Sequence, residues 1–285
     1  MKKFLPVILL LLLPPYTFGT QFEGAKADYD SLNYVSALRK FQDLAEANDN
    51  AEPLFYVALT QLKMSESRNA LSSIKALLKK YPQHIDGHYL EGIINMSMVG
   101  EVSIFKKLGY AKSALKSWQS IVEIEPDNIY GNYAVFSYYA NAPGIAGGNL
   151  DRARELQAHL QAISPVYGEL GLAILKHKNE KFAEAERHYL KATQLDPGRA
   201  SLYFVLAQFH LQRQEPEKVL TALQRYQGLA KTWFDPDNAV VLYMSGLAYA
   251  NLDNVEDAEA SFQDALLAYP SKRLKKMVDD ALEDL

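Results

Sequence analysis

One short pattern recurs along the chain and constrains its fold more than any other feature. An alanine is followed four residues later by a bulky side chain and seven residues later by another apolar one, as in Ala185, Tyr189 and Ala192. This spacing places all three side chains on one face of an α-helix. Further copies begin at Ala37, Ala70, Ala114 (with Trp118 as its bulky residue) and Ala258 (with Phe262), and weaker copies begin at Ala153 and Val219.

The distances between these copies predict a repeating unit. Successive copies start 33, 44, 39, 32, 34 and 39 residues apart. A period of about 34 residues fits one helix hairpin per unit, and such hairpins stack on their neighbours. The longer spacings predict loop insertions at about residues 97–110, 141–149 and 227–236. Prolines, which cannot continue a helix, often close a unit; they are Pro82, Pro126, Pro165, Pro197 and Pro270.

Two units carry enough of the pattern to suggest a family. Residues 166–197 and 239–270 have a small residue in a first helix, then the alanine pattern, then a proline; the matching positions are Ala173, Ala185, Tyr189, Ala192 and Pro197, and Gly246, Tyr249, Ala258, Phe262, Ala265 and Pro270. This arrangement resembles the tetratricopeptide repeat. The resemblance implies an all-α fold, a right-handed α-solenoid of about seven helix hairpins. The expected units are about 20–49, 51–82, 85–126, 128–165, 166–197, 200–236 and 239–270.

The two ends of the chain read differently from the repeats. Lys2 and Lys3 precede an apolar run that ends at Pro14, and small residues lead up to Gly19, which is the layout of a secretory signal peptide over residues 1–19. We therefore expect an exported protein, periplasmic or secreted in a bacterium, with the leader either cleaved or kept as an anchor. No membrane span is expected after its removal. Residues 271–285 are expected to form a capping helix that closes the stack.

Composition argues against several function classes. The 285 residues include no cysteine, and the net charge is −4. Cysteine chemistry is therefore excluded, and the basic surface that nucleic-acid binding needs is missing. His84 and His88 share a helical spacing, and we expect them to have a structural or surface role. We expect no catalytic residue, no metal and no cofactor.

The glycine-rich stretch from Pro143 to Asn149 allows two interpretations. Glycine tolerates the left-handed backbone of tight loops, and Asn149 or Asp151 can cap the helix that follows. The other interpretation is a contact with an anion or a partner. Together with the insertion around Phe105, this Pro-Gly-x-x-Gly-Gly loop resembles a feature of exported bacterial tetratricopeptide proteins, which implies a shared structure and no activity.

The resemblance also implies where a partner would bind. In tetratricopeptide folds the first helix of each hairpin lines a concave groove, and the register of this chain places mainly aromatic and aliphatic side chains there. The predicted groove residues are Phe55, Leu59, Tyr89, Ile93, Phe136, Tyr139, Tyr167, Ile174, Phe204, Leu211 and Tyr243. An apolar groove suits a helical or extended apolar segment of a protein. A shift of one residue in the register would bury several of them between helices.

These observations predict a non-enzymatic scaffold for protein–protein interaction. Two alternatives stay open at this point. Aromatic side chains in a groove also stack on sugars, so a module that binds glycan or peptidoglycan is possible. An enzyme with a site at the insertions 97–110 and 141–149 is the other, although no acid–base pair stands out there.

Overall fold

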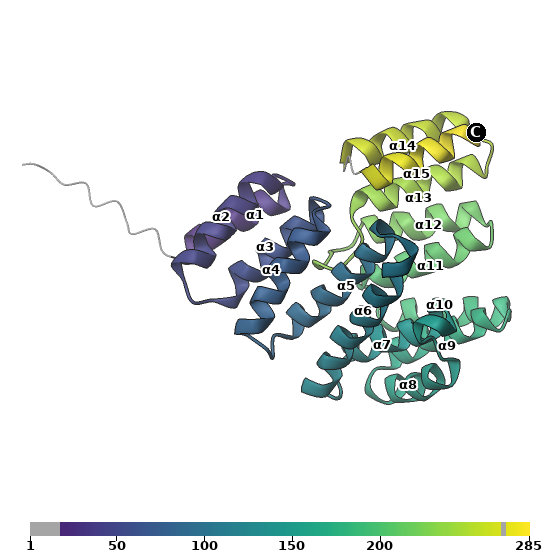
Figure 1. Cartoon of the computed structure of the whole chain (residues 1–285). Coiled ribbons are helices and arrows are strands. Elements are labelled where there is room, and N and C mark those ends of the chain that lie inside the picture. Colours follow the sequence, from purple (N-terminus) through teal and green to yellow (C-terminus); the bar gives the residue numbers. More distant parts are fainter. Residues whose placement is uncertain (1–17, 269–271) are drawn as a thin grey trace, which may run out of the picture. The chain divides into compact units, whose positions relative to one another are not determined.

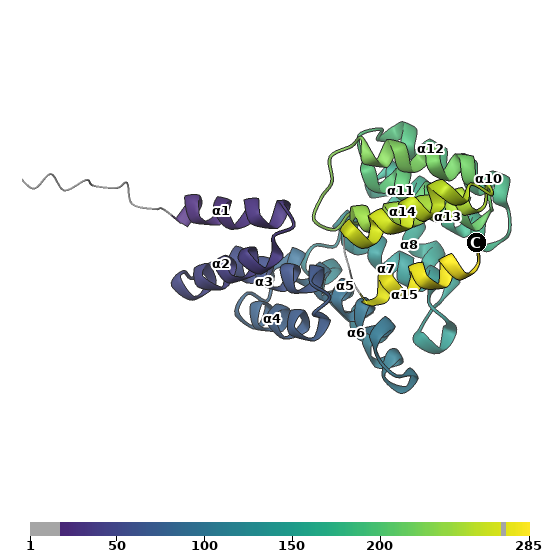
Figure 2. The same cartoon turned by 90° about the horizontal axis from the view of Figure 1, so that it is seen from above.

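The protein is described by a computed structural model that covers residues 18–268 and 272–285 (Figures 1 and 2). The proposed signal peptide falls almost wholly outside these residues, as does Pro270; only its last two residues, Phe18 and Gly19, are included, and they begin the first helix. Within the described part of the chain, all regular structure is helical. None of these helices is both long enough and apolar enough to cross a membrane.

Fifteen α-helices follow one another in the described residues, and the first fourteen form seven consecutive hairpins. Their bounds are α1 (Phe18–Asp30), α2 (Tyr34–Ala47), α3 (Ala51–Lys63), α4 (Ser67–Lys80), α5 (Ile85–Glu101), α6 (Ile104–Ile124), α7 (Ile129–Asn141), α8 (Leu150–Ile163), α9 (Pro165–Lys178), α10 (Phe182–Leu195), α11 (Ala200–Gln212), α12 (Pro216–Gln227), α13 (Asn238–Ala250), α14 (Val255–Ala268) and α15 (Lys272–Glu283). The expectation of an all-α solenoid of about seven hairpins with a closing helix is confirmed.

The chain divides into two compact units, Met1–Leu90 and Glu91–Leu285, with the division inside α5. In the first unit, α1 packs on α2, α2 on α3 and α3 on α4. The alanine pattern forms its core, since Ala37 and Ala70 are fully buried together with the bulky Phe41 and Ile74. Alanine at these positions lets two helices approach closely, and the bulky side chain fills the space beside it.

The second unit repeats this packing over more hairpins. From Glu91 onward α5 packs on α6, where the hydroxyl of Ser117 donates to Glu91 Oε2 at 2.8 Å. The alanine positions Ala114, Ala153, Ala185 and Ala258 are all fully buried. Each side chain predicted to lead the pattern therefore lies in a helix–helix contact.

Two glycines show how close the paired helices come. A Cβ atom on Gly246 would lie 2.5 Å from the ring of Phe262, and one on Gly92 would lie 2.1 Å from Nε1 of Trp118. Such distances are far below van der Waals contact, so only glycine fits without repacking the aromatic ring. Phe262 and Trp118 thus occupy the bulky position of the alanine pattern, and each ring packs directly against a glycine of the other helix in its hairpin.

The turns inside the hairpins fall into two classes. Five hairpins place one non-glycine residue in the left-handed backbone region between their two helices; these are Leu32, Ser65, Glu180, Gln214 and Asp253, with φ between 56° and 62°. The third and fourth hairpins carry the insertions 97–110 and 141–149 there instead. The insertions therefore replace the short left-handed turn of the other five hairpins.

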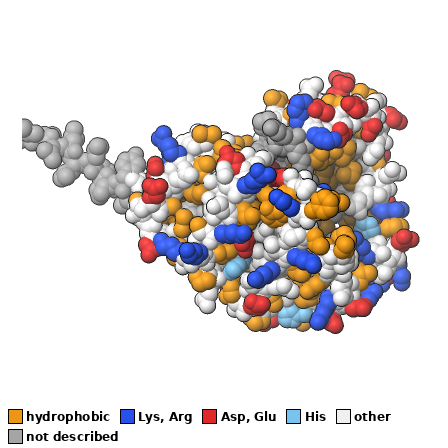
Figure 3. Space-filling view, viewed as in Figure 1, with side chains coloured by type: hydrophobic (Ala, Val, Ile, Leu, Met, Phe, Trp, Pro, Cys, Tyr) orange, Lys and Arg blue, Asp and Glu red, His pale blue; other side chains and the backbone are white. Residues whose placement is uncertain are grey.

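The first insertion differs from its prediction as a loop. Residues 97–110 are mostly helical, because α5 continues to Glu101 and α6 begins at Ile104. A hairpin lengthened by whole turns keeps its backbone hydrogen bonds, which a loop of the same length would lose. Its tip carries the exposed side chains of Ile104 and Phe105. On the face drawn in Figure 3, apolar, basic and acidic side chains are interspersed.

The second insertion is a structured loop, as one of its two interpretations proposed. It contains a single 3₁₀ turn, η1 (Gly144–Ala146), followed by Gly147 at φ 98°. The side chain of Asn149 accepts from the backbone N–H groups of Asp151 and Arg152 at 3.0 Å, which confirms its role as the cap of α8. Tyr138 donates its hydroxyl proton to the carbonyl of Ala146 at 2.6 Å and fixes the loop on α7.

The C-terminal helix α15 closes the stack. Leu274 and Val278 are buried in the same cluster as Phe262 and Ala265 of α14. Lys275 pairs with Asp279 and Lys276 with Asp280 on the exposed side, at 2.9 and 3.1 Å. Among the described residues no further hairpin packs on α15, and the division into an apolar and a charged face suits a helix at the end of a stack.

Candidate functional site

A cavity of about 500 Å³ opens on the second unit along the first helices of three consecutive hairpins, α7, α9 and α11, which Figure 1 labels. We call the surface that these three helices form the inner face. The cavity lies mainly at their C-terminal halves, and Phe182 and Tyr189 of α10 complete its wall. Its lining residues are Tyr133, Ser137, Asn141, Ile174, His177, Lys178, Glu180, Phe182, Tyr189, Val205, Gln208, Phe209 and Gln212.

Aromatic rings form much of the cavity wall. Phe209 contacts Tyr189 and His177, with ring centroids 5.0 and 5.3 Å apart, and His177 also meets Phe182 at 5.7 Å. The guanidinium of Arg213 lies 3.9 Å from the centre of the Phe182 ring and covers its outer face. Burial raises the pKa of Tyr189, so its phenol stays neutral. The wall is thus apolar and stiff, because each ring is held by another.

The polar groups of the cavity are mostly uncharged. Gln208 and Gln212 are exposed at its mouth. The hydroxyl of Ser137 is buried and has no hydrogen-bond partner among the described residues. The pKa of His177 lies below its usual value, mainly because the ring is desolvated and also because Lys178 and Arg213 repel its charged form. These amides, hydroxyl and imidazole can donate or accept hydrogen bonds without adding charge.

The N-terminal halves of the same three helices are covered instead of open. The connection between α12 and α13, which we call the 228–237 segment, places the ring of Phe234 against Tyr130 at 5.2 Å. Tyr167 meets Tyr130 and Tyr133 at 5.9 and 5.0 Å. Arg199 donates from Nη1 to the hydroxyl of Tyr130 at 2.9 Å. We call these five residues the tyrosine cluster.

The tyrosine cluster surrounds the Arg199 cation, with Tyr167 buried and the other members half-buried. The guanidinium lies 5.7 Å from the centre of the Tyr167 ring, and its Nε donates to Asp196 at 2.7 Å. Burial raises the pKa of Tyr167 to about 12, although the nearby Arg199 opposes this shift. The cation is therefore shared among aromatic faces and hydroxyls, and this end of the inner face leaves few groups for another molecule.

Hydrogen bonds of its own hold the 228–237 segment in place. Tyr226 donates its hydroxyl proton to the carbonyl of Pro236 at 2.5 Å. The carboxylate of Asp235 accepts from the backbone N–H and the hydroxyl of Thr232 at 2.7 and 2.8 Å. These contacts close the segment into a compact turn. Phe234 is thereby presented to α7, which lies about a hundred residues earlier in the chain.

The structure places the predicted groove residues in two groups. Phe55, Leu59, Phe136, Tyr167, Ile174 and Phe204 are buried, whereas Tyr89, Ile93, Tyr139, Leu211 and Tyr243 are partly exposed. Of all eleven, Ile174 alone lines the cavity. For the five partly exposed residues, a role in partner binding stays a prediction.

The assignment of Phe136 and Phe204 to a partner surface is wrong. Phe136 is fully buried and Phe204 is 7 % exposed, both in the core of the second unit. The cavity is instead lined by the next residues along, Ser137 and Val205. One residue along a helix rotates the side chain by about 100°, so an error of one position exchanges the core for the surface. Phe55 and Leu59, at 3 % and 1 % exposed, are core residues of the first unit in the same way.

Sequence reasoning missed the 228–237 segment, which it treated only as extra length. A signal was present, because Trp233 and Phe234 are consecutive aromatic residues inside an insertion, where polar residues are usual. It also missed Tyr130 and Arg199 as partners, which are 69 residues apart.

Part of the second unit matches a known protein family. Residues 170–236 and 217–273 match the family model described as Tetratricopeptide repeat. The fold is that of a tetratricopeptide-repeat protein. The matched residues include α10 to α14 and most of α9. Comparison with curated protein sequences finds no match.

Solved tetratricopeptide structures resemble the chain at low sequence identity. One is a thermophilic tetratricopeptide-repeat protein of Thermus thermophilus, at 21% identity and a TM-score of 0.55, covering 68% of this chain and 100% of that one. Another is a tetratricopeptide-repeat protein of Parabacteroides merdae, at 17% identity, a TM-score of 0.55, and coverage of 92% and 97%. The human IFIT1 dimer with PPP-AAAA matches at 19% identity and a TM-score of 0.54; it covers 88% of this chain, which spans only 55% of IFIT1. At these identities the likeness concerns the fold alone.

Proposed function

We propose that the protein is a non-enzymatic scaffold that binds a short apolar segment of a partner protein in the cavity on α7, α9 and α11. The tetratricopeptide fold supports an interaction scaffold in general. The observation that carries the finer proposal is the cavity itself, with its aromatic wall and a polar mouth where Gln208 and Gln212 lie beside the opposite charges of Lys178 and Glu180. No segment among residues 18–268 and 272–285 fills it, whereas the other half of the same three helices is covered.

The chemistry of the cavity favours an uncharged and largely apolar ligand. The half-buried Tyr133, Phe182 and Val205 can contact an aromatic or aliphatic side chain, whereas the rings of Tyr189 and Phe209 are almost fully buried in the wall. An extended peptide also brings unpaired backbone N–H and C=O groups, which lose free energy unless they find partners. Gln208 and Gln212 at the mouth supply both donors and acceptors for them.

The size of the cavity limits the ligand. A volume of about 500 Å³ lies within the range of pockets that hold a small molecule, roughly 300–1,000 Å³. It suits a few side chains of a peptide and is too small for a whole helix. The tyrosine cluster ends the accessible inner face on one side, so the bound segment would leave past the C-terminal ends of the three helices.

Charging the cavity mouth tests this proposal. Short peptides are first selected from a random display library on the full chain, and their binding is then measured on the double variant Gln208→Glu, Gln212→Glu. We expect enrichment of aromatic and aliphatic residues and loss of binding by the variant. The control, Gln224→Glu with Gln227→Glu, adds the same charge to exposed sites on α12 and should bind normally.

Two results would contradict the proposal. One is selected peptides that bind both double variants equally well, which would place their site elsewhere. The other is a failure to select peptides while the chain sediments with purified peptidoglycan and the cavity variant does not. That second result would favour the glycan-binding alternative.

We also propose that the protein acts outside the cytoplasm, on the strength of the signal-peptide pattern in residues 1–19. N-terminal sequencing of the protein recovered from the cell envelope tests this. A new N-terminus at Thr20 is expected. An intact leader in the membrane fraction would indicate an anchor, and an intact chain in the cytoplasm would refute export.

A further inference from the structure

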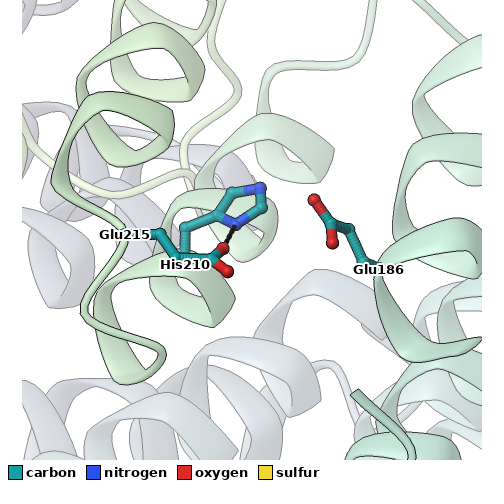
Figure 4. Close-up of side chains that lie close together, drawn as sticks. All are labelled: Glu186, His210 and Glu215. Atoms are coloured by element: carbon teal, nitrogen blue, oxygen red, sulfur yellow. Dashed lines mark hydrogen bonds and ion pairs between the residues drawn. The ribbon is translucent and has the colours of Figure 1, made fainter. Parts of the chain in front are cut away.

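A second cluster of side chains lies away from the cavity, between the fifth and sixth hairpins. It comprises Glu186 on α10, His210 on α11, and Glu215 directly before α12. One imidazole nitrogen of His210 and one carboxylate oxygen of each glutamate lie within 4.8 Å of one another. Figure 4 shows the carboxylate of Glu186 pointing across a gap toward the imidazole, with Glu215 on the other side of the ring.

The imidazole is oriented by its contact with Glu215. His210 is 3 % exposed, and its Nδ1 lies 2.7 Å from Glu215 Oε2. A carboxylate only accepts hydrogen bonds, so Nδ1 carries the proton of this contact. In the neutral ring, Nε2 then keeps its lone pair.

A carboxylate that accepts from one ring nitrogen while the other is free is the arrangement that supports histidine as a metal ligand. A pocket of about 370 Å³ adjoins the cluster, with Glu186, His210 and Lys218 among its lining residues. The pocket gives an ion and its waters a path to the ring. The imidazole is therefore held in one orientation and is accessible to an ion. A buried ion pair with a purely structural role needs no such access.

A cation already occupies the space between the two carboxylates. The ammonium of Lys218 lies 2.7 Å from Glu186 Oε1 and 3.3 Å from Glu215 Oε2. Nearly half of its side chain is exposed, so it can turn out to solvent without unfolding α12. The cluster thus needs a positive charge, and Lys218 supplies it in the absence of another.

We propose that Glu186 and Nε2 of His210, with Glu215 holding the imidazole, form a site for a divalent transition-metal ion such as Zn²⁺, which displaces the ammonium of Lys218 and completes its coordination with water. An imidazole and a carboxylate are ligand types that Zn²⁺ accepts, whereas Ca²⁺ and Mg²⁺ favour oxygen ligands throughout. Ligand atoms at about 2 Å from the ion require the side chains to draw closer than they are now. Glu186 provides this freedom because its side chain is partly exposed.

The bound ion would join two successive hairpins, since Glu186 belongs to the fifth and His210 to the sixth. A nearby cluster offers a matched control. There Glu169 accepts from Lys191 and contacts His188 Nδ1, both at 2.6 Å. It has the same histidine, glutamate and lysine but lacks the second carboxylate, and both oxygens of Glu169 are in use.

Titration of the metal-free full chain with Co²⁺ and Zn²⁺ tests the proposal, using visible absorption of Co²⁺, calorimetry and the melting temperature. We expect one ion per chain at this site and a higher melting temperature with Zn²⁺. Glu186→Gln should weaken binding by about tenfold or more, and Lys218→Met should strengthen it, because its competing cation is gone. His188→Gln should bind as the unchanged protein does.

Three results would overturn the proposal. These are absence of binding, binding that Glu186→Gln leaves unchanged, or binding that His188→Gln removes. His210→Gln should also lose the ion, but because His210 is buried this variant puts the fold itself at risk. Glu186→Gln and Lys218→Met alter partly exposed side chains, so they decide the question even then.

Discussion

The two halves of the inner face in the second unit are built from the same three helices but end in opposite states. At the N-terminal halves of α7, α9 and α11, the tyrosine cluster is covered by Phe234 and organised around Arg199. At the C-terminal halves, the cavity leaves Gln208 and Gln212 without such a cover from the described residues, and the buried hydroxyl of Ser137 has no hydrogen-bond partner among them. Tyr133 belongs to both, since it contacts Tyr167 and lines the cavity.

The difference teaches that the repeats alone do not determine where a solenoid binds. An insertion outside the helices, the 228–237 segment, supplies an aromatic partner to one half and none to the other. Because the first half is covered, its polar groups are paired within the protein. The second half is open, so its polar groups can gain free energy by pairing with another molecule.

The largest expected effect concerns the contact between α9 and α10, which supports both halves of the inner face. Ala185 is fully buried at a helix–helix contact, so Ala185→Asp should cost about 4 kcal/mol or more of the free energy of unfolding. Ala183→Asp, two residues away on the exposed side of α10, should stay within about 0.5 kcal/mol of the unchanged protein. Urea denaturation followed by circular dichroism measures both. Equal losses of unfolding free energy in the two variants would mean that burial of Ala185 in the helix–helix contact does not support the inner face.

Next in size is the covered half. Tyr167→Ala removes a ring that is 6 % exposed and should cost about 3 kcal/mol of unfolding free energy. Gln208→Ala, on the open half, should change stability little because the amide is exposed. Similar losses from both variants, measured by the same denaturation, would contradict a difference between the halves.

Removing the Phe234 ring should make the covered N-terminal half of the inner face more like the open C-terminal half. Phe234→Ala deletes the ring contact with Tyr130 and should cost about 1 kcal/mol, the worth of an aromatic pair with modest burial. The fluorescence of Trp233, whose ring lies 5.3 Å from that of Phe234, should then report a looser segment. If selected peptides bind this variant as before but longer peptides gain affinity, the cover limits the groove. An unchanged length preference would show that it does not.

Ser137 gives a prediction with opposite signs for stability and binding. Its buried hydroxyl has no partner in the described part of the chain, so Ser137→Ala should be neutral or should stabilise the fold by up to about 1 kcal/mol. Binding of selected peptides should weaken if a ligand pairs with this hydroxyl. A loss of stability on denaturation would mean that the hydroxyl is already satisfied.

The smallest effect is the pH dependence that His177 adds. Its folded pKa lies below the usual 6.5, so as the pH falls below about 6.5 the unfolded chain binds the proton first. Stability is therefore lost between pH 6.5 and the lower folded pKa, and His177→Gln should remove that part of the loss. Denaturation at several pH values between about 5 and 7 measures it, and identical slopes for the two proteins would refute it.

The sequence was sufficient to predict the packed side of each hairpin. The alanine pattern has a helical period, and the residues that lead it, from Ala37 to Ala258, are buried as that period requires. The exposed side was harder, because Phe136 and Ser137 are neighbours in sequence yet face the core and the cavity. A period identifies a face only to within about one residue.

Other parts of the site depend on contacts that no local pattern carries. Phe234 meets Tyr130 across about a hundred residues, and neither position belongs to the alanine pattern. The His210 cluster likewise joins side chains of two successive hairpins. The positions of Glu186 and Glu215 follow no sequence pattern that would mark them as neighbours of His210. Such contacts are decided by how successive hairpins stack, and they become visible only in three dimensions.

The most direct test of the central claim is photo-cross-linking from the cavity mouth. A photoreactive phenylalanine replaces Gln208 in one variant of the full chain, and the matched position Gln224 on α12 in a second variant. The account predicts that a selected peptide is cross-linked from position 208, that an excess of unlabelled peptide suppresses the adduct, and that position 224 gives none. Cross-linking from 224 alone, or equally from both, would contradict the claim that the cavity on α7, α9 and α11 receives the partner.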